Sequence, residues 1–160
     1  MDYMEINGWK FYFHACFTAQ VTSLAQEVLQ LRVEKPHEYH KKKQTKLPAA
    51  IYKVVTEVIA RDPLNPQFRQ GGTLGDENRY WFRAKFLQQF RLFFRCSEQS
   101  KTIILGWVND FGILRAYESK TDAYKTFKRM LDAGHPPSDW EQLLRESTGE
   151  SGFLFQAPFS

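Results

Sequence analysis

Apolar and polar side chains alternate with a period of two in residues 8–14 (GWKFYFH), which predicts a β-strand near the N-terminus. From Thr18 onward the apolar residues recur at helical spacing, and we expect Thr18 to cap that helix. A second helical pattern follows Pro36. Because Pro48 lies inside this pattern, a kink or a new helix start is expected near it.

Residues 61–80 are rich in proline and glycine and predict a loop. Three strand-like runs follow, and their short connections favour an antiparallel meander. The runs cover residues 80–87, 90–96 and 102–109. A helix capped by Thr121 and ended by Gly134 comes next, and Ser138 with Glu141 forms a capping box for a short last helix.

Helical patterns that precede a compact set of strands predict an α+β fold, with helices packed on a small curled antiparallel sheet. The chain has 160 residues, a length typical of one domain. We place this domain at residues 1–146. Residues 147–160 combine small polar residues with an aromatic patch and are expected to form a flexible tail.

The composition indicates a globular protein with an excess of rings. Aromatic residues make up 16% of the chain, and the net charge of +4 gives a weak preference for an anionic partner. Cys16 and Cys96 show no disulfide or metal-ligand spacing and are expected to be free thiols. The acidic N-terminus lacks the apolar core of a signal peptide, and no apolar run has transmembrane length. We therefore expect a soluble cytoplasmic protein.

The first two runs of the meander predict a hairpin with one apolar and one basic face, because side chains alternate along a strand. The apolar face holds Phe82, Ala84, Phe86, Leu92, Phe94 and Cys96. The basic face holds Trp81, Arg83, Lys85, Arg91, Phe93 and Arg95. No acid alternates with these cations, and like charges opposite one another destabilise a sheet. The pattern favours a polyanion over a merely solvated face, because cations with stacking rings are typical of single-stranded RNA binding.

Other candidate groups are less specific. The run His40 to Lys43 is typical of a solvated helix end, with long-range steering toward RNA as the alternative. The four histidines are scattered, so nothing pairs them as in a two-histidine nuclease. No motif or spacing indicates a cofactor or a metal site, and we expect neither.

Several motifs in one order resemble the YhaV family of toxin–antitoxin ribonucleases. They are WFRAKF (81–86), RLFFR (91–95), IILGWVND (103–110), KTDAY (120–124) and GHPPSDWE (134–141), with NGWKFYFHACF (7–17) and FRQGGTLG (68–75). The resemblance implies a fold similar to the RelE toxins. It also implies cleavage of mRNA, on or off the ribosome, and a partner that resembles the PrlF antitoxins, which are small AbrB-like DNA-binding proteins.

The resemblance also implies roles for individual residues. Lys85 matches a lysine that assists proton transfer, Arg91 an arginine that contacts the scissile phosphate, and Tyr124 a tyrosine that orients the substrate. Arg115 is the best match for a last arginine clamp, although its spacing to Tyr124 is longer than in RelE. Arg83 stands where RelE has a second lysine and would clamp phosphate, since arginine stays protonated.

These residues suit attack of a ribose 2′-OH on its neighbouring phosphate, a reaction in which fixed cations stabilise the developing charge without a metal. Arg83, Lys85 and Arg91 are each expected to face solvent. Two alternatives remain open: a non-catalytic RNA-binding module, and an interaction protein whose basic face docks an acidic partner.

Overall fold

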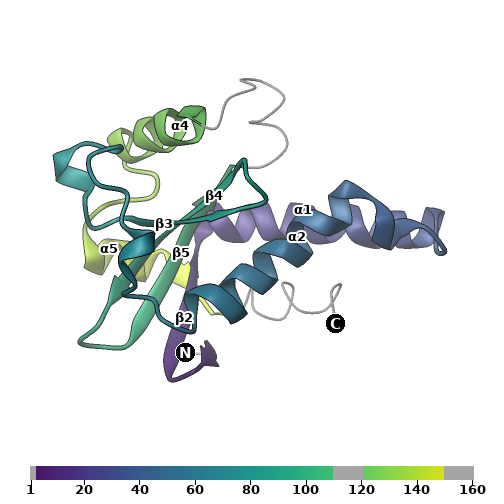
Figure 1. Cartoon of the computed structure of the whole chain (residues 1–160), viewed down its shortest axis with the longest axis horizontal. Helices are drawn as coiled ribbons and strands as arrows, with labels where there is room; N and C mark the ends of the chain where they lie inside the picture. Colours follow the sequence, from purple (N-terminus) through teal and green to yellow (C-terminus); the bar gives the residue numbers. More distant parts are fainter. Residues whose placement is uncertain (1–2, 110–120, 150–160) are drawn as a thin grey trace.

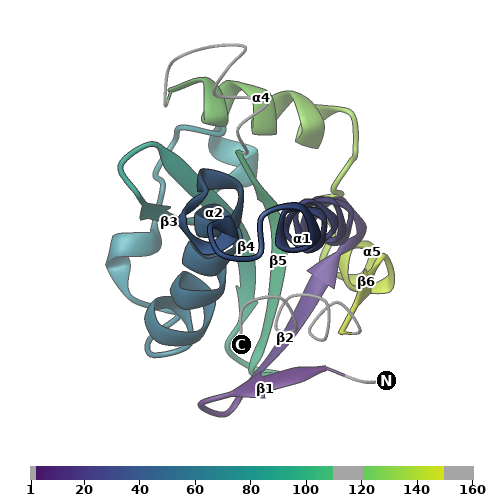
Figure 2. The same ribbon diagram turned by 90° about the vertical axis from the view of Figure 1, so that its right-hand side faces the viewer.

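A computed structural model describes residues 3–109 and 121–149. Its centre is a six-stranded sheet with helices on both faces (Figures 1 and 2). The strands are β1 (Met4–Ile6), β2 (Trp9–His14), β3 (Phe82–Phe86), β4 (Phe90–Ser97), β5 (Thr102–Val108) and β6 (Ser147–Thr148). The α-helices are α1 (Ala15–Glu34), α2 (Lys43–Lys53), α4 (Thr121–Asp132) and α5 (Trp140–Arg145). A π-helix, η2 (Val54–Ile59), continues α2, and three 3₁₀ turns are η1 (Tyr39–Lys41), η3 (Pro66–Phe68) and η4 (Asp76–Asn78). The predicted α+β class is confirmed.

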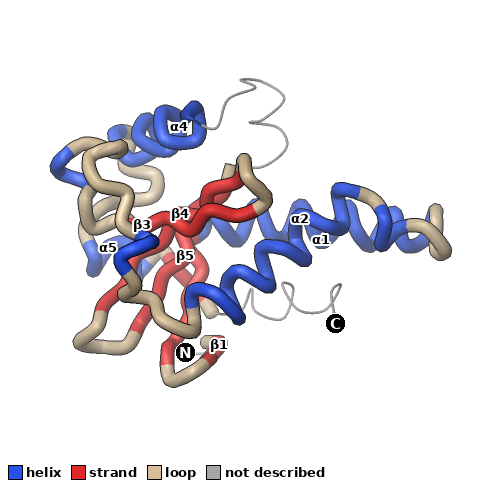
Figure 3. The backbone as a smooth tube through the Cα atoms, in the orientation of Figure 1, coloured by secondary structure: helices blue, strands red, loops and turns tan. Residues whose placement is uncertain are grey.

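The strands run in the order β1-β2-β5-β4-β3, with β6 beside the C-terminal half of β2. The meander of β3, β4 and β5 is antiparallel, as predicted. The N-terminal strand β2, however, pairs parallel to β5, so the sheet is mixed and not purely antiparallel. Parallel neighbours need a long connection between them. The helices α1 and α2 lie in the connection that returns the chain from β2 to the meander (Figure 3).

Two apolar cores cover the two faces of the sheet because side chains alternate along each strand. The larger core joins Phe11, Phe13 and Phe94 to α1 and α2. The second core joins Phe93 and Trp107 to α4 and α5. The predicted apolar face of the hairpin lies in the larger core. The fold is therefore three layers deep, because helices also pack on the side that carries the basic residues.

Three local expectations were wrong. Helix α1 begins at Ala15, and its N-cap is His14, whose ring accepts a hydrogen bond from the Cys16 backbone N–H. Helix α5 is capped by Asp139 and not by Ser138. Residues 147 and 148, which we assigned to the tail, form β6 on the edge of β2. Residues 150–160 lie outside the described residues.

Pro48 lies inside α2, and the helix passes through it without a new start. The irregular stretch comes later, where α2 continues into the π-helical turn η2. Insertion of a residue into a helix produces such a turn. The proline is therefore tolerated, and the change in helical geometry lies beyond it.

Candidate functional site

The β3–β4 hairpin places the predicted cations in register. Lys85 lies opposite Arg91, and Arg83 lies opposite Phe93. The tight turn that joins the strands uses Leu87 and Gln88 in left-handed conformations, with φ of 45° and 64°. Two like charges face each other across this pair, an arrangement that destabilises a sheet unless an anion lies between or above them.

Arg91 is buried, contrary to our expectation that it faces solvent. Only 4% of its surface is exposed. Its Nη1 donates to the carbonyl oxygens of Gln88 (3.0 Å) and Phe90 (2.8 Å), while its Nε is buried without a hydrogen-bond partner. Among residues 3–109 and 121–149, no carboxylate forms an ion pair with Arg91. Because a buried cation without a counter-ion is unfavourable, this guanidinium is suited to an anionic ligand.

Asn109 holds the turn that carries Arg91. Its Oδ1 accepts from the Arg91 backbone N–H at 2.6 Å, and its Nδ2 donates to the Gln89 carbonyl at 2.9 Å. Asn109 has no exposed surface. The sequence reasoning missed this residue. The available signal was a polar residue directly after an apolar strand, in the motif IILGWVND.

Helix α4 brings Tyr124 to the hairpin. Arg83 donates from Nε to the Tyr124 hydroxyl at 3.0 Å and from Nη1 to the Gln67 carbonyl at 2.8 Å. Since the phenol oxygen accepts from Arg83, its own hydrogen is left to donate to a further group. Lys85 is exposed beside Arg83 on the same face. The structure thus brings together Arg83, Lys85, Arg91 and Tyr124.

Trp81 and Phe93 have no exposed surface, so neither ring face is accessible to an RNA base. Phe93 stacks on Phe127 of α4 with ring centroids 4.4 Å apart, and Trp81 meets Phe127 edge-on at 5.0 Å. A Cβ at Gly106 would lie 2.6 Å from the Trp81 ring, so glycine is needed for this packing. In this structure both residues belong to the core and pack α4 against the sheet.

Arg95 lies four residues along β4 from Arg91, about 13 Å away, and two residues from Phe93, the cross-strand partner of Arg83. Its guanidinium is within 5.9 Å of the ring centroids of Tyr80, Trp81 and Trp140. Its Nη1 donates to the Ser138 carbonyl at 2.7 Å. Burial lowers the pKa of Arg95. These contacts tie β4 to the start of α5, and RNA binding by Arg95 stays a prediction.

Residues 11–148 match a family described as a toxin with endonuclease activity, of a toxin–antitoxin system. The chain belongs to the YhaV toxin family. It is therefore a toxin with endonuclease activity, and it has an antitoxin partner.

Three curated relatives of the YhaV family come from Escherichia coli. The ribonuclease toxin YhaV of strain K12 is 48% identical over 150 residues, which make up 92% of this chain and 97% of that protein. Toxin YhaV of strain O157:H7 is 48% identical and that of strain O6:H1 is 47% identical, with the same coverage. No solved structure matches the chain significantly.

Three further expectations concern the last arginine clamp, a metal site and a membrane span. Arg115 lies outside the described residues. Among the residues that the structure describes, no group of three or more His, Cys, Asp or Glu side chains has the geometry to hold a metal ion. No helix in that part of the chain is long and apolar enough to cross a membrane.

Both cysteines are free and half-buried. Burial raises the pKa of the Cys96 thiol to about 11, and burial also raises that of Cys16. Both thiols are therefore protonated near neutral pH. Since the thiolate is the reactive form, neither is suited to act as a nucleophile.

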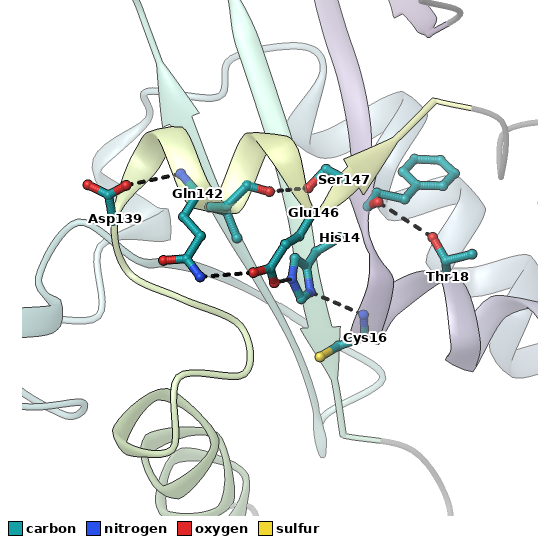
Figure 4. Close-up of polar contacts among 9 residues, drawn as sticks. His14, Cys16, Thr18, Asp139, Gln142, Glu146 and Ser147 are labelled. Atoms are coloured by element: carbon teal, nitrogen blue, oxygen red, sulfur yellow. Dashed lines mark hydrogen bonds and ion pairs between the residues drawn. The ribbon is translucent and has the colours of Figure 1, made fainter.

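His14 is structural. Its Nδ1 accepts from the Cys16 N–H at 3.1 Å, so the neutral ring carries its hydrogen on Nε2, which lies 2.9 Å from Glu146 Oε1 (Figure 4). Gln142 also donates to Glu146, at 3.1 Å. With both ring nitrogens engaged, His14 has none left for proton exchange with a substrate. This geometry disfavours the two-histidine nuclease for His14.

Glu146 gives a pH-dependent prediction. The hydrogen bond from His14 lowers the pKa of Glu146 below its ordinary value of 4.5. A lowered pKa stabilises the folded state where the group is ionised, and this contribution is lost as pH falls through the folded-state pKa. We expect Glu146→Gln to lower Tm most near pH 7, with a difference from wild type that shrinks below pH 4.5. Thermal melts from pH 3 to 7 measure it, and a constant difference would contradict the assignment.

Proposed function

We propose that this toxin is an endoribonuclease that cleaves mRNA by attack of a ribose 2′-OH on its neighbouring phosphate, without a metal ion. The observation that carries the proposal is the buried guanidinium of Arg91 opposite Lys85, which has no carboxylate partner among the described residues and whose Nε has no hydrogen-bond partner. Such a group suits a phosphate, and the ribonuclease named among the relatives is consistent with RNA as the substrate. Clustered cations also repel divalent metal ions, which leaves charge stabilisation to the side chains.

In this reaction the 2′-oxygen forms a bond to phosphorus while the bond from phosphorus to the 5′-oxygen breaks. The 2′-OH proton passes to solvent while Lys85 stabilises the charge that develops on the 2′-oxygen, and the leaving 5′-oxygen gains a proton from Tyr124 or from solvent. Arg91 and Arg83 meet the charge that builds on the phosphate oxygens. The products are a 2′,3′-cyclic phosphate and a 5′-hydroxyl. Arg115 remains our candidate for an additional clamp.

For its partners and setting, we propose a PrlF-like antitoxin of the AbrB type and mRNA in the cytoplasm, free or on the ribosome. The cations of the hairpin suit acidic groups of an antitoxin as well as phosphates, so direct cover of this face explains neutralisation. Attraction between complementary charges speeds the association of toxin and antitoxin, and salt weakens this attraction.

The chemistry of the product ends tests the proposal. We expect purified toxin to cleave a defined RNA at an undiminished rate in EDTA, and to leave 2′,3′-cyclic phosphate or 3′-phosphate ends. End-specific ligation or mass spectrometry identifies the products. Dependence on a divalent metal with 3′-hydroxyl ends would reject the mechanism. RNA binding without any cleavage would favour the non-catalytic module.

A further inference from the structure

The net charge of the protein is concentrated in one segment. We call residues 32–46 the basic tip; they span the last turn of α1, the connection with η1, and the first turn of α2. The segment holds six basic and two acidic residues, a net charge of +4. The whole chain has 22 basic and 18 acidic residues, also +4, so the remaining residues balance at 16 of each. The basic residues are Arg32, Lys35, Lys41, Lys42, Lys43 and Lys46.

The basic tip is remote from the hairpin site. Figure 1 shows it at the outer end of the paired helices α1 and α2, which project beyond the sheet, and Figure 2 shows the pair end-on. Helix α1 has 20 residues and is therefore about 30 Å long. In Figure 1 the basic tip extends well beyond the β3–β4 hairpin, so a ligand there is separate from the hairpin site.

Helix stability explains only part of this charge. Arg32 and Lys35 lie at the C-terminus of α1, where the helix dipole favours cations. Lys41, Lys42 and Lys46 lie around the N-terminus of α2, where the dipole disfavours them. That end has no side-chain cap and no acid in its first turn. An anionic ligand would remove this penalty, whereas a structural role would place acids there.

The surface chemistry points to backbone phosphates. The basic residues are exposed except Lys42, which is half-buried. Among the described residues, no carboxylate forms an ion pair with Arg32, Lys41 or Lys42. The ring of Tyr39 is half-buried between Arg32 and His40, so it offers little area for stacking on an unpaired base. Apart from the imidazoles of His37 and His40, the tip exposes no aromatic ring. A surface dominated by lysines favours sequence-independent contact with a duplex over recognition of single strands.

We propose that the basic tip binds the phosphate backbone of double-stranded RNA and anchors structured RNA while the hairpin site acts on a single-stranded segment. The inference rests on the proposed function in one respect, that RNA is the anion that this protein meets. It adds a second contact surface with a different preference.

A binding experiment tests the tip independently of cleavage. The full-length triple variant Lys41→Gln, Lys42→Gln, Lys46→Gln is titrated with an RNA duplex of about 16 base pairs at several salt concentrations. We expect affinity to fall at least about tenfold and the salt slope to fall by about two to three, since each phosphate contact contributes about 0.7 to 0.9. Cleavage of a short single-stranded RNA stays at the wild-type rate.

A matched control removes three exposed cations outside the basic tip: Lys53→Gln, Arg129→Gln, Arg145→Gln. The two variants have the same net charge, so only a local surface distinguishes them, and thermal melts confirm that both fold. Equal duplex binding by the two variants overturns the proposal. Weaker antitoxin binding with unchanged duplex binding also overturns it and assigns the tip to a protein. If the wild type cleaves no RNA yet binds duplex through the tip, the proposed function fails and this inference stands.

Discussion

Replacing Arg91 with methionine is expected to reduce RNA cleavage by about 100- to 1000-fold, the usual effect of removing one preorganised charge that stabilises a transition state. Methionine keeps the length and volume of the buried stem but removes the guanidinium. The hydrogen bonds to the carbonyls of Gln88 and Phe90 are lost, and so is the unfavourable burial of a cation that has no counter-ion. Because these effects oppose each other, we expect the free energy of unfolding to change by about 1 kcal/mol or less.

The measurement combines single-turnover cleavage with urea denaturation of the same preparations. Arg91→Lys is the informative companion, because it keeps a charge but loses the fixed fork of donors, and we expect it to recover only part of the rate. Arg79→Ala is the control, since Arg79 forms an exposed ion pair with Asp76 outside the site. Wild-type cleavage by Arg91→Met would place the reactive face elsewhere.

Alternation along the strands predicted both faces of the hairpin correctly, because a period of two assigns each side chain to one side of a sheet. It could not predict what covers each face. Trp81 and Phe93 lie on the same side of the sheet as the cations, as expected. Phe127, which belongs to a helix more than 30 residues further along the chain, packs against both rings and buries them. The sequence therefore located the cations, whereas the role of the aromatic residues depended on tertiary packing.

Two other errors have local physical causes. Arg91 lies on the polar face of its strand, as alternation predicts. Its guanidinium is nevertheless buried, because it donates to carbonyl groups of the adjoining turn. Helix α1 begins where His14 accepts a backbone hydrogen bond, and histidine is not among the common N-cap residues, so Thr18 was the better candidate by composition. The parallel pairing of β2 with β5 joins segments about 90 residues apart, and no local pattern specifies such a partner.

Replacing Phe127 with alanine is expected to lower the free energy of unfolding by about 3–5 kcal/mol, as for other fully buried phenylalanines. Phe127 has no exposed surface. It stacks on Phe93 and, with centroids 5.6 Å apart, on Trp107, and it meets Trp81 edge-on. Since small proteins are stable by only about 5–15 kcal/mol, this loss is a large share of the total. Urea denaturation measures it, with the slope checked against wild type.

The same substitution is expected to reduce cleavage even where the protein stays folded, because α4 carries Tyr124 to Arg83. Hydrogen exchange reports this directly: amides of α4 should lose protection while those of β4 and β5 keep theirs. Tyr124→Phe separates the two roles, since it retains the ring that packs edge-on against Phe93 and removes only the hydroxyl bonded to Arg83. We expect Tyr124→Phe to lose activity with little change in stability. If hydrogen exchange shows that Phe127→Ala loosens α4 but the variant cleaves at the wild-type rate, the position of α4 does not matter for the reaction. Wild-type cleavage by Tyr124→Phe would exclude the Tyr124 hydroxyl from it.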